Sequence, residues 1–154
     1  MTLHPAPFHG GLVFMDALYT AIAHASGGGR DGHVRSEDDR LDFDTRPPVE
    51  MGGSGEGTNP EQLFAAGYSA CFLGAVHAVG REMKLDTKDA AVSASVSIGP
   101  SADTGFEIAA ELDIYIPNVT ADEARTIAET AHRDICPYSK AINGNVPVVL
   151  NIVE

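Results

Sequence analysis

The sequence is poor in basic residues. Only 10 of its 154 residues are lysine or arginine, against 22 aspartates and glutamates, which gives a formal net charge of −12 at pH 7. A chain of this charge repels the phosphate backbone of nucleic acids and anionic lipid head groups. Nucleic acid is therefore excluded as the expected partner, and no association with a membrane surface is expected.

Long apolar runs are also missing. No stretch reaches the ~18 consecutive apolar residues of a membrane-spanning helix, and the first 25 residues do not combine a basic start with an apolar run. We therefore expect a cytoplasmic protein that is neither exported nor embedded in a membrane. The length suits one domain with a core of its own, which we expect over residues 17–154, after an N-terminal arm at residues 1–16.

Cysteine is scarce, since the chain holds only Cys71 and Cys136. They form no Cys-x-x-Cys motif. In a reducing cytosol such a pair is more often a set of buried thiols, metal ligands or redox groups than a structural disulfide. Most buried free cysteines are simply small core residues, so that alternative stays open beside the chemical ones.

The rest of the chain has globular composition, with strand-like and helix-like segments in succession. Alternating apolar and polar residues predict strands, and apolar residues at helical spacing behind capping residues predict helices. Their order indicates the α+β class. The expected strands span residues 18–25, 41–46, 91–98, 106–116 and 146–153, and the expected helices span residues 60–83, 121–135 and 139–142.

The helix expected at residues 60–83 has clear start signals. Asn59 can cap it, Pro60 suits its first turn, and Gln62 completes a capping box. Its middle, around Cys71, is almost wholly apolar and small, and a helix that is apolar on all sides is buried. Because a short chain has little else with which to enclose a central helix, we expect a homodimer.

Redox chemistry at Cys71 needs a thiol with a lowered pKa, which a helix N-terminus or a nearby cation can provide. Cys71 lies about three turns inside its helix, where the helix dipole helps little. Arg30, at the turn that follows Gly27-Gly28-Gly29, is the candidate cation, because a guanidinium stays charged when buried. Glu61 is the candidate carboxylate partner of Arg30. The simpler alternatives are a solvated turn arginine and a glutamate that complements the helix dipole.

Helix geometry raises an objection to this grouping. Ten residues at the usual rise place Glu61 about 15 Å from Cys71 along a straight helix, which is more than one guanidinium can span. Either the regular helix begins after Glu61 and the chain folds back, or the two residues meet Arg30 in different conformations or across two subunits. The sequence leaves these alternatives open.

Two other chemistries could use the same cysteines. Cys136 and His132 share a helix face at i, i+4, and Cys71 could add a third zinc ligand. A Cys–His hydrolase would need a histidine beside Cys71, but His77 is about 240° round the helix from it. We therefore expect no metal and no bound cofactor. The alternative to an enzyme is a dimeric module that binds hydrophobic ligands and uses both cysteines as core residues.

Two segments carry a family resemblance: the run from Gly57 to Phe72 (GTNPEQLFAAGYSACF) and Cys136-Pro137-Tyr138-Ser139. They resemble the organic hydroperoxide resistance (Ohr) branch of the Ohr/OsmC family, and favour it over the sister OsmC branch. The resemblance runs from about Leu18 to Val153. It implies an intertwined α+β homodimer, with a buried central helix that carries Cys71, antiparallel sheets around this helix, and two active sites at the subunit interface.

The resemblance also implies roles for four residues. Cys71 matches the peroxidatic cysteine, Cys136 the resolving cysteine, Arg30 the activating arginine, and Glu61 the carboxylate partner of that arginine. The implied activity reduces alkyl or fatty-acid hydroperoxides to alcohols under oxidative stress, through a sulfenic acid and then a disulfide between the two cysteines. The expected reductant is an external dithiol, such as the lipoyl group of a lipoylated protein. Four apolar residues are expected to favour bulky hydroperoxides over hydrogen peroxide: Met51, Leu63, Phe64 and Phe72.

Overall fold

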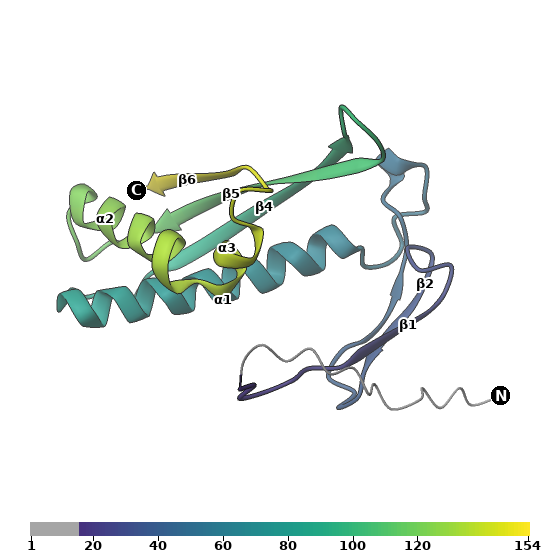
Figure 1. The fold of residues 1–154 in the computed structure, drawn as a ribbon, viewed down its shortest axis with the longest axis horizontal. Coiled ribbons are helices and arrows are strands. Elements are labelled where there is room, and N and C mark those ends of the chain that lie inside the picture. Colours follow the sequence, from purple (N-terminus) through teal and green to yellow (C-terminus); the bar gives the residue numbers. More distant parts are fainter. Residues whose placement is uncertain (1–15) are drawn as a thin grey trace.

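The computed structural model describes residues 16–154, so the arm expected at residues 1–16 lies outside the described residues except for Asp16. The described chain combines two three-stranded sheets with helices, which confirms the α+β class (Figure 1). The strands are β1 (Ala23–Gly27), β2 (Gly32–Ser36), β3 (Asp42–Thr45), β4 (Ala91–Pro100), β5 (Phe106–Tyr115) and β6 (Val148–Val153). The helices are the 3-10 turn η1 (Val49–Met51), α1 (Pro60–Met83), α2 (Ala121–Thr130), the π-helical turn η2 (Ala131–Ile135) and α3 (Pro137–Ile142).

The long helix α1 has the bounds that its capping signals predict. The Asn59 side chain accepts a hydrogen bond from the Gln62 backbone N–H, and the Gln62 side chain accepts one from the Asn59 backbone N–H. These two bonds satisfy donors that the start of a helix leaves without partners. Lys84, in the left-handed region at φ 57°, ends the helix. The prediction for residues 60–83 is confirmed.

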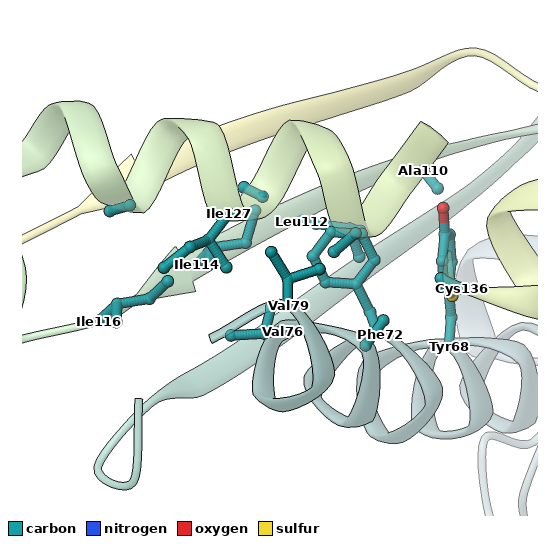
Figure 2. Close-up of a cluster of buried hydrophobic side chains, with 14 residues drawn as sticks. Tyr68, Phe72, Val76, Val79, Ala110, Leu112, Ile114, Ile116, Ile127 and Cys136 are labelled. Atoms are coloured by element: carbon teal, nitrogen blue, oxygen red, sulfur yellow. The ribbon is translucent and has the colours of Figure 1, made fainter. Parts of the chain in front are cut away.

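One face of α1 packs into the hydrophobic core of the molecule. Tyr68, Phe72 and Val76 follow one another at i, i+4 spacing, so they lie on one side of the helix, and all three are fully buried. Each such side chain contributes about 1.5–3 kcal/mol on burial. Figure 2 shows this row against the residues that cover it, which include Leu112 and Ile114 of β5 and Ile127 of α2.

The opposite face of α1 is also apolar but has no cover among residues 16–154. Ala66, Ala70 and Gly74 lie there at i, i+4 spacing, and all three are exposed. By length and composition α1 is the one described helix that could cross a membrane, with 33% of its most apolar window buried in the chain. Packing against the core explains why one face of α1 is apolar. The exposed face of small residues needs a separate explanation.

The larger sheet has the strand order β4-β5-β6. β4 and β5 form the expected hairpin, paired antiparallel from Ala91↔Tyr115 to Pro100↔Phe106. β6 pairs with β5 in parallel, so the expectation of purely antiparallel sheets is wrong here. The physical reason is the crossover through α2, η2 and α3, which returns the chain to Ala110 in the first half of β5 and lets β6 run in the same direction.

The smaller sheet projects from this body (Figure 1). Its order is β1-β2-β3 with antiparallel pairing throughout, and a backbone bridge between Thr45 and Thr58 ties its last strand to the segment before α1. Every residue of β1 is exposed. A small sheet with so little cover is marginal in water on its own, so this sheet needs a packing surface beyond the described residues.

Two strand predictions in this sheet need correction. The strand expected at residues 18–25 begins only at Ala23 and continues to Gly27. β2 was not expected at all, because Gly32, His33 and Arg35 give it no apolar alternation. Pairing with a neighbour on each side makes β2 a strand, and single-sequence patterns do not contain that information.

The helix expected at residues 121–135 changes geometry along its length. Its start is confirmed, since Thr120 and Glu123 form a capping box. After Thr130 the turn widens to π-helical geometry, and the Cys136 N–H donates to the Ala131 carbonyl at 2.8 Å. A π-turn changes the direction of the residues that follow and often lies at a functional site. Here it delivers Cys136 to the start of α3.

The contact between Gly80 and Thr87 can be tested by mutation. A Cβ at Gly80 would lie 2.5 Å from Thr87 Cγ2 and 2.7 Å from Thr87 Oγ1. We expect Gly80→Ala to lower the free energy of unfolding by about 1–3 kcal/mol, measured with urea, although alanine is the better helix former. In the double variant with Thr87→Ala the loss should be smaller than the sum of the two single losses. A Gly80→Ala protein as stable as the wild type would contradict this packing.

Candidate active site

The two cysteines face each other in the structure. The thiol of Cys136 lies 3.6 Å from Cys71, Sγ to Sγ. Cys71 is half-buried on α1. Cys136 is fully buried where η2 meets α3, and Figure 2 shows it beside Tyr68. A disulfide requires about 2.05 Å between the sulfurs, so a shift of about 1.5 Å would join them. Residues 65 positions apart in the sequence are thus brought within reach of direct thiol chemistry.

The pKa of Cys71 is raised in the single chain. Burial is the main cause, the backbone N–H of Tyr138 opposes it by favouring the thiolate, and the neighbouring Cys136 adds to the rise. Neither Arg30 nor Glu61 is among the groups that shift the pKa of Cys71. A reactive thiol needs the opposite shift. The low pKa expected at Cys71 is therefore not a property of one chain by itself.

Arg30 and Glu61 form the ion pair that the sequence predicted. Arg30 Nη1 donates to Glu61 Oε2 at 3.0 Å, and Arg30 Nη2 donates to Glu61 Oε1 at 2.7 Å. Two parallel bonds of this kind fix the plane of the guanidinium. The β1–β2 turn supplies the arginine, and the first turn of α1 supplies the glutamate. The hydrogen bond from Arg30 holds the pKa of Glu61 below its usual range.

The ion pair and the thiol pair are separate in one chain. α1 is regular from Pro60 to Met83, so Glu61 and Cys71 stay about 15 Å apart along the helix. This excludes the alternative in which the helix begins after Glu61 and the chain folds back. Meeting in another conformation and meeting across two subunits remain.

Sequence reasoning did not foresee a hydrogen-bonded group of three polar residues beside the thiols, although it considered one of them, His132, as a zinc ligand. Tyr68 precedes Cys71 by one turn, and its hydroxyl lies 2.8 Å from Ser139 Oγ. His132 Nδ1 lies 2.9 Å from the same Ser139 oxygen. All three residues are close to a cysteine in the sequence, and this closeness is the one sequence feature that could have pointed to them. Only the packing of α1 against η2 and α3 brings them together.

The alternative chemistries find no support in the geometry. His132 is hydrogen-bonded to Ser139, and His77 Nδ1 lies 3.0 Å from Thr87 Oγ1. Both histidines thus have structural partners other than Cys71. Within residues 16–154, no three histidine, cysteine, aspartate or glutamate side chains gather as a metal site would require.

A cavity of about 290 Å³ adjoins the ion pair. Glu61 lies in its wall, and Met51, which the sequence analysis expected near the site, is also there. Phe72 is instead fully buried in the core, so its expected place in a substrate pocket is wrong. The remaining wall is mostly small or apolar and comprises Pro48, Asn59, Gln62, Ala65, Val96 and Ile98.

The Arg30–Glu61 pair gives a pH-dependent contribution to stability. Because folding lowers the pKa of Glu61, this contribution is fully present above the ordinary carboxyl pKa and disappears as the pH falls through the lowered value. We expect Glu61→Gln to reduce the free energy of unfolding by about 0.5–1 kcal/mol at pH 7, and to match the wild type in acid. Denaturant titrations across this pH range check it, with exposed Glu50→Gln as the neutral control. A deficit that persists in acid would contradict the assignment.

Comparison with known proteins gives a family. Residues 53–151 match the OsmC-like protein family. A protein of Xanthomonas axonopodis pv. citri named organic hydroperoxide resistance protein is 47% identical over 137 residues, which cover 88% of this chain and 94% of that protein.

Two crystal structures resemble the whole described fold. A Legionella pneumophila organic hydroperoxide resistance protein OsmC has a TM-score of 0.85 at 43% identity, with 90% of this chain and all of that chain covered. A Vibrio cholerae putative organic hydroperoxide resistance protein, which has a molecule of captopril bound in one of its active sites, has a TM-score of 0.83 at 42% identity over 91% of this chain and 95% of its own. The match to the family covers more than half of the residues of this chain. The chain therefore belongs to the OsmC-like protein family.

Proposed function

We propose that this protein is a thiol peroxidase that reduces organic hydroperoxides, with Cys71 as the peroxidatic and Cys136 as the resolving cysteine. The observation that carries the proposal is the 3.6 Å separation of the two sulfurs, one half-buried and one fully buried. The names of the relatives, which refer to organic hydroperoxide resistance, support it. Two unrelated core cysteines would have no reason to face each other from different helices.

The reaction has two steps. In the first, the Cys71 thiolate attacks the peroxide oxygen farther from the alkyl group, so that an S–O bond forms and the O–O bond breaks. The leaving alkoxide takes a proton and departs as the alcohol, and Cys71 becomes a sulfenic acid. In the second, Cys136 attacks the Cys71 sulfur, an S–S bond forms, and the sulfenic oxygen leaves as water.

A second subunit supplies the missing cation in this proposal. The thiol pKa of Cys71 is raised in the single chain, while the Arg30–Glu61 pair lies at the N-terminal end of α1 and Cys71 in the middle of this helix. Antiparallel packing of two α1 helices would bring the ion pair of each chain toward the thiol of the other. Arg30 would then stabilise both the thiolate and the charge that develops on the leaving oxygen.

Two uncovered surfaces support this homodimer. The small residues Ala66, Ala70 and Gly74 allow another helix to approach α1 closely, and the fully exposed β1 lacks a packing surface. An intertwined pair of chains would cover both at once. The cavity beside Glu61 would then adjoin the partner's thiol, where its apolar wall suits the alkyl group of a hydroperoxide.

The proposed cycle ends with an external dithiol. Of the two sulfurs in the disulfide, Cys71 is the more accessible and Cys136 is enclosed in the core. A dithiol such as dihydrolipoamide, presented by a lipoylated protein, would attack Cys71 first and release Cys136 as the thiol. The second thiol of the reductant then completes the exchange and forms its own disulfide.

Replacement of each cysteine by serine should affect peroxide reduction in a different way. We expect Cys71→Ser to reduce consumption of cumene hydroperoxide to the uncatalysed background, because no nucleophile remains. Cys136→Ser should keep the first turnover and then stop with Cys71 oxidised to sulfinic acid. Stopped-flow kinetics and intact-mass spectrometry check both variants. A Cys71→Ser protein with wild-type turnover would contradict the peroxidase proposal and favour a ligand-binding module as the function.

The dimer should be required for a reactive thiol. We expect Ala66→Arg, which puts a cation on the exposed face of α1, to give monomers and to slow the first step roughly a hundredfold, since Arg30 no longer reaches the partner's Cys71. Sedimentation equilibrium and the pH profile of Cys71 alkylation measure the two effects. Thr126→Arg, on an exposed position of α2, is the matched control. Monomers with undiminished activity would show that one chain suffices.

A further inference from the structure

Three polar side chains from three helical segments, two of them buried and one half-buried, meet beside the thiol pair. We call this group the serine node: Tyr68 of α1, His132 of η2 and Ser139 of α3. The Ser139 hydroxyl oxygen lies 2.8 Å from the Tyr68 hydroxyl and 2.9 Å from His132 Nδ1. Tyr68 and Ser139 have exposed fractions of 0% and 1%, and His132 is half-buried. Neither step of the proposed reaction uses these groups.

The node surrounds both cysteines at a spacing of one helical turn. Tyr68 precedes Cys71 by three residues on α1. His132 precedes Cys136 by four residues, and Ser139 follows Cys136 by three. The bond between Tyr68 and Ser139 therefore joins the helix that carries Cys71 to the helix that starts directly after Cys136. The bond between His132 and Ser139 joins the segments before and after Cys136. Together the two bonds limit how far Cys136 can move relative to Cys71.

The hydrogen-bonding capacity of the three groups lets the node satisfy all of its members. Burial lowers the pKa of His132, which favours the neutral ring, and a neutral ring can accept or donate at Nδ1 according to its tautomer. The Ser139 hydroxyl can donate one hydrogen bond and accept others, so it can pair with both Tyr68 and His132. Every buried side-chain nitrogen and oxygen in the described part of the chain has a partner. Removal of one member leaves another without its partner in an apolar core, which is costly.

If these residues only filled the core, apolar side chains would do so without hydroxyl groups that need hydrogen-bond partners. A phenylalanine at residue 68 and an alanine at residue 139 would pack the same core without hydroxyl groups to satisfy. Tyr68 already packs on Phe64, Phe72 and Tyr138 through its ring. The hydroxyl adds only the link to Ser139, which ties α1 to α3 at the level of the two sulfurs.

We propose that the serine node holds Cys136 in place for the second step of the reaction, so that Tyr68, Ser139 and His132 are positioning residues for disulfide formation. The inference rests on the proposed function. In that step the Cys136 sulfur bonds to the Cys71 sulfur, the S–O bond of the sulfenic acid breaks, and the thiol proton leaves with the oxygen as water. The sulfurs must close from 3.6 Å to about 2.05 Å, so a loosened Cys136 slows this step and not the first.

The consequence is a change in the fate of the sulfenic acid. A second peroxide molecule competes with Cys136 for it and yields sulfinic acid irreversibly. When Cys136 is held in position, the intramolecular step wins because the attacking sulfur has a high effective concentration. When the node is broken, the same peroxide dose should convert more Cys71 to sulfinic acid.

The test compares Tyr68→Phe and Ser139→Ala with the wild type in the homodimer. We expect the rate of the first step to stay within about twofold, and disulfide formation to slow by about tenfold, the factor that corresponds to one lost hydrogen bond of upper-range strength. Tyr115→Phe, which removes a hydroxyl from a partly exposed tyrosine of β5, is the control. Single-turnover stopped flow separates the steps, and mass spectrometry gives the sulfinic fraction.

A graded series at His132 separates positioning from simple destabilisation. Asn can place a polar atom close to the position of Nδ1, so His132→Asn should restore most of the disulfide rate that His132→Leu loses. Thermal unfolding of the two variants is compared alongside. Equal losses in both variants, or equal slowing of both reaction steps, would overturn the proposal.

An equilibrium measurement keeps this test independent of peroxide turnover. In a dithiothreitol redox buffer, Tyr68→Phe and Ser139→Ala should lower the equilibrium constant for the Cys71–Cys136 disulfide by severalfold. If the wild type consumes no peroxide yet these shifts occur, the proposed function fails and the positioning role stands. Unchanged equilibrium constants together with an unchanged sulfinic fraction would overturn the positioning role.

Discussion

The pitch of α1 is the constraint on which the rest of the site depends. A regular helix fixes Glu61 and Cys71 about 15 Å apart, and the bidentate bonds of Glu61 hold Arg30 at the far end of that distance. The charge that would activate the thiol therefore cannot reach it in the same chain. In the single chain, burial makes Cys71 a weaker acid than a free cysteine. Activity in our proposal arises only when a second chain supplies the cation, which couples the chemistry to assembly.

The same helix explains how the two thiols could take the different roles that we propose. One face of α1 faces the core, where Cys136 is enclosed, and Cys71 lies at the edge of that face, partly accessible. In the proposed cycle, peroxide and reductant approach the accessible Cys71, and Cys136 meets the oxidant only through the Cys71 sulfenic acid. If Cys136 is the resolving thiol that we propose, its burial keeps it reduced until the sulfenic acid forms. The cost is that Cys136 must be held accurately, because a buried group cannot search for its partner freely.

Local rules predicted the parts of this structure that local forces determine. The Asn59–Gln62 capping box, the β4–β5 hairpin and the start of α2 at Thr120 were all predicted, since each is specified by residues a few positions apart. The Arg30–Glu61 pair was also predicted, but from the expectation of a buried arginine, whereas the Arg30 side chain is 44% exposed. The low pKa expected at Cys71 stays a prediction, since the pKa is raised in the single chain and the cation was expected from elsewhere, with a second subunit among the alternatives.

What the sequence did not predict depends on pairing between distant segments. β2 is a strand because β1 and β3 lie on either side of it, although its own residues do not alternate. The parallel pairing of β6 follows from a crossover that no short pattern encodes. The serine node is the strongest case, because Tyr68 and Ser139 lie 71 residues apart and each reads as an ordinary helical residue. Polar groups that meet in a core are visible only in three dimensions, and in this molecule they lie where the chemistry that we propose for the two cysteines would require fixed geometry.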